Sequence, residues 1–162
     1  MSLRRRELLQ WLAAPAALSL ANPATAAETR LPTPESLPAA AEQAAAQGQP
    51  LLLLASLPGC RFCEELRRSH LLPGLRADTA AARLYAVQLD LRNPSILIDF
   101  DGQRRSQDAV LRRLGVRFAP TVLLLGPRGQ ALAEPLIGAL LPDFYASYLD
   151  ERLNQARQAL RP

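Results

Sequence analysis

The chain is poor in the residues that build metal and nucleic-acid sites. Its 162 residues include two cysteines, one histidine and no lysine. A structural zinc site needs four cysteine or histidine ligands, and a copper-binding cysteine pair needs further soft ligands, so this composition disfavours both metals. The net charge is only +4, and three of the 19 arginines lie within residues 4–6, so the rest of the chain has too little excess charge for a nucleic-acid surface.

No hydrophobic run is long enough for a membrane-spanning helix, which needs roughly 20 apolar residues. The N-terminus instead has the order of an export signal: three arginines, an apolar stretch broken by Pro15, and small residues up to Ala26. The stretch "RRRELLQ" resembles a twin-arginine signal, and a general secretory signal is the alternative. We therefore expect cleavage near Ala26 and a mature protein in the periplasm, without a membrane span, where disulfides form.

The mature chain fits one domain, since domains usually have roughly 100–200 residues. Residues 1–26 are the expected signal, residues 27–35 an extended leader, and residues 36–162 the folded domain. Hydrophobic patterns and turn residues predict helices over 36–48, 60–73, 106–115 and from 142 onward, strands over 50–56, 82–91, 119–126 and 130–139, and a hairpin inserted around 94–105. The apolar face of the last helix is expected to carry Phe144, Tyr148, Leu149 and Leu153. Because βαβ units bury both faces of a sheet, this order predicts an α/β fold with a mixed central sheet flanked by helices.

Both cysteines lie in the stretch "PGCRFC", where the strand over residues 50–56 is followed by a helix. A thiol in the first turn of a helix ionises readily, because unpaired backbone N–H groups and the positive end of the helix dipole stabilise the thiolate. Cys60 is then the candidate nucleophile, and Cys63, one helical turn later, is the candidate resolving thiol. Arg61 would favour the thiolate further, and Phe62 would offer an apolar contact to a partner. The redox-active disulfide is the only redox group that we expect, with no separate cofactor.

A purely structural disulfide is the alternative, because two cysteines of an exported protein usually pair. A bridge between Cys60 and Cys63 closes a very short loop, however, and the entropic stabilisation by a disulfide grows with loop length. Redox chemistry is therefore the favoured reason for the pair. The single histidine, His70, lies about two helical turns beyond Cys63, and we expect a surface or structural role for it.

The combination of a buried strand, "PGCRFC" at a helix start and "VRFAPTVLLLGPRG" later in the chain resembles the thioredoxin superfamily. The resemblance implies a thioredoxin-like fold over residues 36–162, with a cis proline, Pro120, facing the cysteine pair. Ala119, the residue before it, would offer backbone groups to an extended substrate segment. Thioredoxin itself has a buried aspartate six residues before its first cysteine, where this chain has Leu54. This departure counts against general, cytoplasmic-style reductase chemistry.

A looser resemblance, to the SoxW-type periplasmic thioredoxins associated with sulfur oxidation, rests on the export signal, "CRFC", the "LIDFDGQ" insertion and the terminal "GALLPDFYASYLDERL". It implies a periplasmic thiol:disulfide oxidoreductase that reduces cysteine-containing client proteins through Cys60 and Cys63. We expect the protein to be a monomer. Its electrons would come from a membrane thiol carrier. Two alternatives stay open: a reductant dedicated to cytochrome c maturation, and a non-catalytic adaptor in which a structural disulfide only staples a partner-binding fold.

Overall fold

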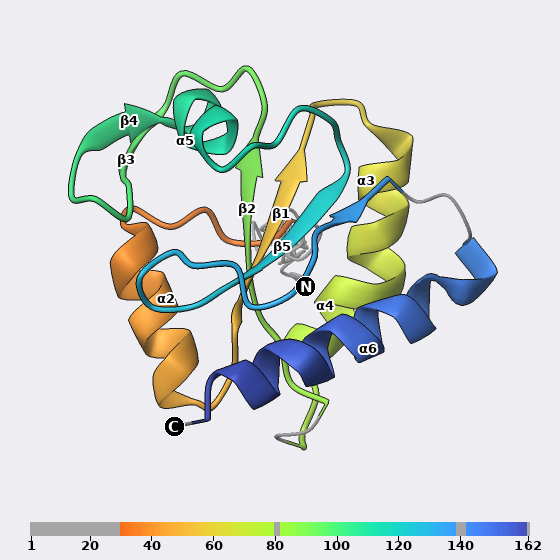
Figure 1. Cartoon of the computed structure of the whole chain (residues 1–162). Helices are drawn as coiled ribbons and strands as arrows, with labels where there is room; N and C mark the ends of the chain where they lie inside the picture. The colour runs from red at the N-terminus through yellow and green to blue at the C-terminus, as the bar shows by residue number, and fades with distance from the viewer. Residues whose placement is uncertain (1–29, 80–81, 139–141, 162) are drawn as a thin grey trace, which may run out of the picture.

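A mixed four-stranded sheet forms the centre of the molecule, and the computed structural model describes residues 30–79, 82–138 and 142–161 of the chain. The expected export signal, with its cleavage site near Ala26, lies outside the described residues. The strand order is β2-β1-β5-β6 (Figure 1). The strands are β1 (Leu51–Ser56), β2 (Tyr85–Asp90), β5 (Thr121–Leu125) and β6 (Leu136–Ile137). β1 pairs in parallel with β2 and antiparallel with β5, so the predicted mixed sheet is confirmed.

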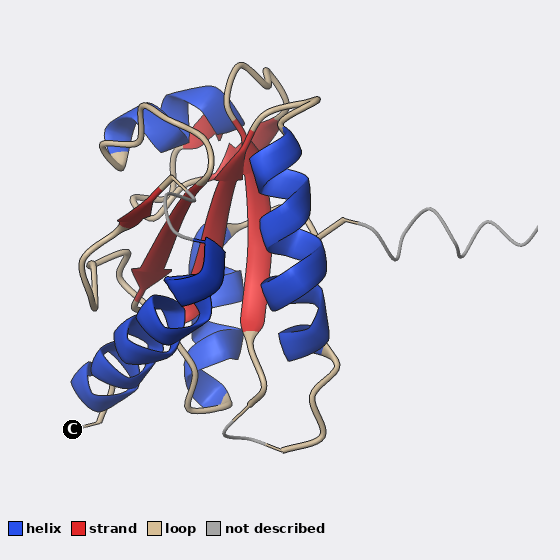
Figure 2. Ribbon diagram, turned by 90° about the vertical axis from the view of Figure 1, so that its right-hand side faces the viewer, coloured by secondary structure: helices blue, strands red, loops and turns tan. Residues whose placement is uncertain are grey.

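Helices cover both faces of this sheet (Figure 2). One face packs against α2 (Leu37–Ala46) and α5 (Gln107–Arg113). The other face packs against α6 (Pro142–Ala159) and the helical stretch that follows the cysteine motif. This stretch consists of α3 (Arg61–Leu66), the π-helix η1 (Arg67–Leu71) and α4 (Leu72–Leu75). The predicted fold class, an α/β fold with a mixed sheet between helices, is therefore confirmed.

β1 lies in the middle of the core, which explains why its sequence is continuously apolar. Leu51, Leu53 and Ala55 belong to the cluster under α2 and α5, whereas Leu52 and Leu54 belong to the cluster under the other helices. All five side chains are fully buried. Successive side chains of a strand point to opposite faces, and each buried leucine contributes about 1.5–3 kcal/mol. β1 therefore joins the two halves of the core.

The predicted hairpin is present as a separate two-stranded sheet of β3 (Ile96–Ile98) and β4 (Arg104–Ser106). Gly102, in its turn, has a φ of 78°, which glycine adopts without strain. The fully buried carboxylate of Asp99 accepts hydrogen bonds from Nε and Nη2 of Arg113, in α5, at 2.6 and 2.8 Å. Burial alone would raise the pKa of Asp99, but these bonds and a backbone N–H bond lower that pKa below its ordinary value. The ion pair attaches the hairpin to α5.

Two elements differ from the sequence prediction in length. The helix after the cysteines, which was expected to bend or end at Pro73, runs through η1 and past that proline to Leu75. The change of register in η1 places Pro73 in the first turn of α4, where a missing N–H is tolerated. The strand predicted over 130–139 is reduced to β6 and an isolated bridge at Ala131, because Pro135 has no N–H to donate to a ladder.

The buried face of α6 is also different from the predicted one. Tyr145, Leu149 and Leu153 are buried against the sheet, whereas Phe144 and Tyr148 are 58% and 46% exposed. The three buried residues are spaced by four and so line one side of the helix. The two exposed aromatics are also spaced by four and lie beside that line. The prediction is therefore right for the two leucines and wrong for Phe144 and Tyr148.

The extended segment before α2 is hydrogen-bonded first to β2, one edge strand of the central sheet, and then to β3 of the hairpin. The backbone N–H of Gln88 donates to the carbonyl of Pro32 at 2.9 Å, and that of Ile98 donates to the carbonyl of Glu35 at 2.8 Å. Leu31 is buried in the cluster beneath α6. The segment therefore packs on the domain and covers its open edge. Among the helices that the structure describes, none combines the length and apolar character needed to cross a membrane.

Candidate active site

The cysteine motif lies at the strand-to-helix junction that the sequence predicts. β1 ends at Ser56, a tight turn follows, and Cys60 is the N-cap residue of α3. Gly59, in the turn, has a φ of 72°, and a residue with a side chain would adopt this conformation only with strain. The turn thus places Cys60 at the start of a helix.

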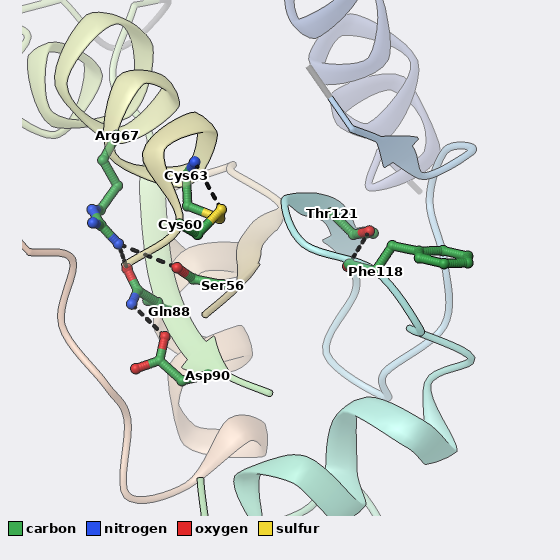
Figure 3. The surroundings of a disulfide bond; sticks show 8 residues. All are labelled: Ser56, Cys60, Cys63, Arg67, Gln88, Asp90, Phe118 and Thr121. Carbon is green, nitrogen blue, oxygen red and sulfur yellow. Dashed lines mark hydrogen bonds between the residues drawn. A yellow bond between two sulfur atoms is a disulfide. The ribbon is translucent and has the colours of Figure 1, made fainter. Parts of the chain in front are cut away.

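Cys60 and Cys63 form a disulfide, and the surroundings of the two residues differ (Figure 3). Cys63 is fully buried, whereas Cys60 is partly exposed. The backbone N–H of Cys63 donates a hydrogen bond to Sγ of Cys60 at 3.2 Å. A partner can therefore approach Cys60 from solvent while Cys63 is shielded. The roles of nucleophile and resolving thiol stay predictions, and this asymmetry is compatible with them.

The helical stretch after Cys60 places the positive end of its dipole at that residue. α3, η1 and α4 follow one another without a gap from Arg61 to Leu75. When the disulfide is reduced, a thiolate at Cys60 would lie at this end of the helix, next to the N–H of Cys63. Both interactions favour the ionised sulfur. Glu64, the acidic residue of the first turn, opposes them in part.

Arg61 and Phe62, the two residues between the cysteines, are both at the surface. Phe62 is 55% exposed, and the guanidinium carbon of Arg61 lies 5.6 Å from the centre of its ring, within cation–π range. The two side chains therefore form one surface feature beside the disulfide. Their predicted roles, stabilising the thiolate and contacting a partner, remain predictions.

The peptide bond between Ala119 and Pro120 is cis, the form that the family resemblance implies. Pro120 is buried and directly precedes β5, whose first residue, Thr121, pairs with Ala55 of β1. Because β1 continues from Ala55 toward the cysteines, this pairing brings the proline to the side of the motif. Thr121 Oγ1 donates to the carbonyl of Phe118 at 2.9 Å (Figure 3). Phe118 itself is 67% exposed.

A groove of about 690 Å³ is lined by residues that precede these two parts of the candidate site, although neither cysteine nor Pro120 lines it. Leu57, just before the cysteine motif, lies in its wall together with Phe118 and Ala119, just before the cis proline. Leu57 is three residues before Cys60 in the sequence. The binding of substrate by Ala119, Pro120, Arg61 and Phe62 stays a prediction, and of these four residues only Ala119 lines the groove.

A buried polar network that the sequence analysis does not foresee lies next to the disulfide. Arg67, one turn after the second cysteine, donates through Nη1 to Oε1 of Gln88 at 2.7 Å and to Oγ of Ser56 at 3.4 Å. Nε2 of Gln88 donates in turn to Oδ1 of Asp90 at 2.6 Å (Figure 3). The network therefore ties the helix of the cysteine motif to the ends of β1 and β2.

Arg67 remains a cation although only 8% of its surface is exposed. Burial lowers the pKa of Arg67, and the positive charge of Arg30 lowers it further, whereas Glu64 and Asp90 raise it. Arginine starts from so high a pKa that the group is protonated at neutral pH. The sequence holds one signal for this network: Gln88 and Asp90 occupy alternate positions of an otherwise apolar strand and so share a face.

Leu54 and His70, the other two positions considered from the sequence, lie in packed surroundings. Leu54 is fully buried in the apolar cluster beneath α6, so the core holds no carboxylate at this position. The ring of His70, in η1, lies 5.5 Å from the ring of Tyr145, and burial raises the pKa of Tyr145 above its ordinary value. Within the described part of the chain, no three histidine, cysteine or acidic residues are grouped so that they could hold a metal ion.

Comparisons with known proteins relate the chain to one family. A family model described as a thioredoxin-like domain matches residues 37–153, which include the cysteine motif and the cis proline. Among solved structures, that of a DsbH oxidoreductase is similar at 20% identity, covering 88% of this chain and 96% of that chain with a TM-score of 0.48. No curated protein matches this sequence. The family match extends over most of the chain, and the chain therefore belongs to the thioredoxin-like domain family.

Proposed function

We propose that the protein is a thiol:disulfide oxidoreductase that reacts through Cys60. One observation carries this proposal: a disulfide at a helix start joins a partly exposed cysteine to a fully buried one. The exposed sulfur can meet a partner, and the buried sulfur is held where it can attack the first. A disulfide that only closes this short loop would stabilise the fold little, which supports a chemical role for the pair.

In the reducing direction, the Cys60 thiolate attacks one sulfur of a client disulfide. A mixed disulfide forms, and the other client sulfur leaves as a thiolate and takes up a proton. Cys63 then loses its proton and attacks Sγ of Cys60. The Cys60–Cys63 bond forms, the mixed disulfide breaks, and the second client sulfur leaves. The client has gained two electrons and the protein has become oxidised.

The compartment and the direction belong to the same proposal. The N-terminal export signal and the resemblance to SoxW-type thioredoxins support a monomeric periplasmic protein that reduces cysteine-containing clients, with a link to sulfur oxidation. A membrane thiol carrier would return the two electrons to the Cys60–Cys63 disulfide, because the periplasm is kept oxidising and offers no soluble reducing buffer.

Trapping of a mixed disulfide tests the proposal. In a Cys63→Ser variant no sulfur can release the client, so reaction with a peptide disulfide should leave that peptide bound to Cys60. The matched Cys60→Ser variant keeps only the buried thiol and should trap little. The unaltered protein should also accelerate the reduction of insulin by dithiothreitol. If neither trapping nor insulin reduction occurs, and the potential lies below about −300 mV, the disulfide is structural.

A further inference from the structure

A second surface hollow, a pocket of about 750 Å³, begins directly beside the cysteine motif. Pro58 and Gly59, the residues before Cys60, form part of its wall. Consecutive Cα atoms are about 3.8 Å apart, so the wall of the pocket begins one residue before Cys60, whose sulfur is the reactive one. A client whose cysteine meets Cys60 would therefore carry its neighbouring residues over this pocket.

The wall of the pocket is strongly basic. Its charged residues are four arginines and one glutamate: Arg30, Arg67, Arg68, Arg76 and Glu64. The lining therefore has a net charge of +3. The sequence spreads these arginines over the leader, η1 and the segment after α4, so their proximity appears only in the folded chain.

The acidic partners of these arginines leave much of the charge accessible. Nη2 of Arg30 lies 3.4 Å from Oδ2 of Asp90, and Nη2 of Arg68 lies 3.3 Å from Oε2 of Glu65. The side chains of Arg30 and Arg68 are nonetheless 63% and 76% exposed. Exposed pairs of this kind contribute little and exchange partners readily. Both cations can therefore turn to an incoming anion.

Arg67, the buried arginine among the lining residues, is held in place by its hydrogen bonds. Both of its hydrogen bonds leave from Nη1, toward Gln88 and Ser56, and its buried Nε has no hydrogen-bond partner. Burial and the nearby charge of Arg30 lower the pKa of Arg67, which means that keeping this side chain protonated in the folded protein costs free energy. An anion in the pocket would offset that cost.

We propose that this pocket binds a carboxylate of the client, from an aspartate or glutamate close to the client's reactive cysteine. The inference rests on the proposed function, since it concerns the specificity of the same site. Planar guanidinium groups match carboxylates in geometry and charge. The protein therefore selects cysteines in acidic segments, and Arg68, the most exposed of the paired cations, contributes to this selection through charge.

Three peptide disulfides test this preference. Each is a symmetric dimer of a blocked peptide, Gly-X-Gly-Cys-Gly-X-Gly, in which X is glutamate, glutamine or arginine. Reduced protein is mixed with each dimer, the reaction is stopped with acid, and the released peptide thiol is measured by chromatography. For each peptide, the rate of reduction by the protein is divided by the rate at which dithiothreitol, a neutral dithiol, reduces the same peptide. This division is needed because neighbouring charges change the intrinsic reactivity of the peptide disulfides. Oxidised glutathione forms a fourth arm and supplies carboxylates from a small molecule.

We expect the normalised rate to be about three-fold or more higher for the glutamate peptide than for the glutamine peptide at low salt, and lowest for the arginine peptide. The ratio should fall toward one near 1 M salt, where the screening length is about 3 Å. Arg68→Gln should lower the ratio by about two-fold, and Arg68→Glu should lower it further. Arg128→Gln, which removes an equal charge in the turn after β5, is the matched control and should leave the ratio unchanged.

Three results would overturn the inference. Equal normalised rates for glutamate and glutamine peptides exclude a carboxylate site, and equal effects of Arg68→Gln and Arg128→Gln show general charge attraction instead of a pocket. An acceleration confined to oxidised glutathione shows that a small molecule supplies the carboxylate. If even the glutamine peptide fails to react with the reduced protein, the proposed function itself fails, which is a different outcome from reaction without charge preference.

Discussion

Replacing Arg67 with methionine should destabilise the protein measurably, because the side chain anchors a buried network. Methionine keeps the unbranched stem of the side chain but is two atoms shorter than arginine, and it has no charge and no N–H donors. It leaves Oε1 of Gln88 without the 2.7 Å bond from Arg67, in a residue that is only 3% exposed. The bond to Ser56 is long, at 3.4 Å, and adds little.

The expected loss can be estimated from these contacts. A hydrogen bond to a charged group contributes about 1.5–3 kcal/mol, and a buried acceptor without a partner costs about 1–3 kcal/mol. The loss is offset in part, because methionine packs well and the repulsion between Arg67 and Arg30 disappears. We therefore expect a decrease of about 2 kcal/mol in the free energy of unfolding. With a urea dependence of about 1–3 kcal/mol per molar, the midpoint should fall by about 1 M.

Urea unfolding of the oxidised protein measures this loss, and the neighbouring arginine provides a matched control. Arg68 is 76% exposed and pairs with Glu65 across one turn, so Arg68→Met should cost less than about 0.5 kcal/mol. The double variant Arg67→Met/Gln88→Met should lose less than the sum of its single variants, because no acceptor is then left unsatisfied. Equal midpoints for Arg67→Met and Arg68→Met would refute the reasoning.

Two further predictions concern the core and the hairpin. Leu54→Ala should lower the free energy of unfolding by about 2–5 kcal/mol, since Leu54 is fully buried in the central strand, and a urea midpoint near that of the unaltered protein would contradict this packing. The pKa of Asp99 lies below its ordinary value, and that of Asp101 is lowered to about 2 by its hydrogen bonds from Arg105 and a backbone N–H. Carboxylates with lowered pKa values stabilise the fold above the unfolded pKa, about 3.9, and this stabilisation is lost as the pH falls. The urea midpoint should therefore decrease from about pH 4 toward pH 2. The Asp99→Asn variant should show a shallower decrease. An identical pH profile in the variant would count against the Asp99 ion pair.

Local signals in the sequence were enough to place most elements of the fold. The helix predicted over residues 106–115 is present as α5, and Oγ of Ser106 caps it by accepting from the backbone N–H of Ala109 at 3.2 Å. The continuous apolar run of β1 predicted a strand buried on both faces, and the turn residues of the hairpin predicted β3 and β4. The cysteine motif was predicted to lie between a strand and a helix because the two sequence patterns meet there. In each case a few adjacent residues determine the structure.

Features that depend on distant residues could not be predicted in this way. The network of Arg67 joins a helix to two strands, and no pattern within η1 marks that arginine as buried. Phe144 and Tyr148 were placed on the wrong face of α6, because aromatic character suggested burial while the packing of Tyr145 and Leu149 against the sheet decides the rotation of the helix. The basic pocket is invisible in the sequence for the same reason.

The reactivity of Cys60 tests the central claim most directly. In a Cys63→Ala variant, which has one thiol, the rate of alkylation by iodoacetamide between pH 3 and 10 reports the ionisation of Cys60. The account predicts a midpoint within about 3.5–7.5, because the helix start stabilises the thiolate, and a return to about 8.5 when the same variant is unfolded in urea. A midpoint of about 8.5 or above in the folded protein would contradict the account.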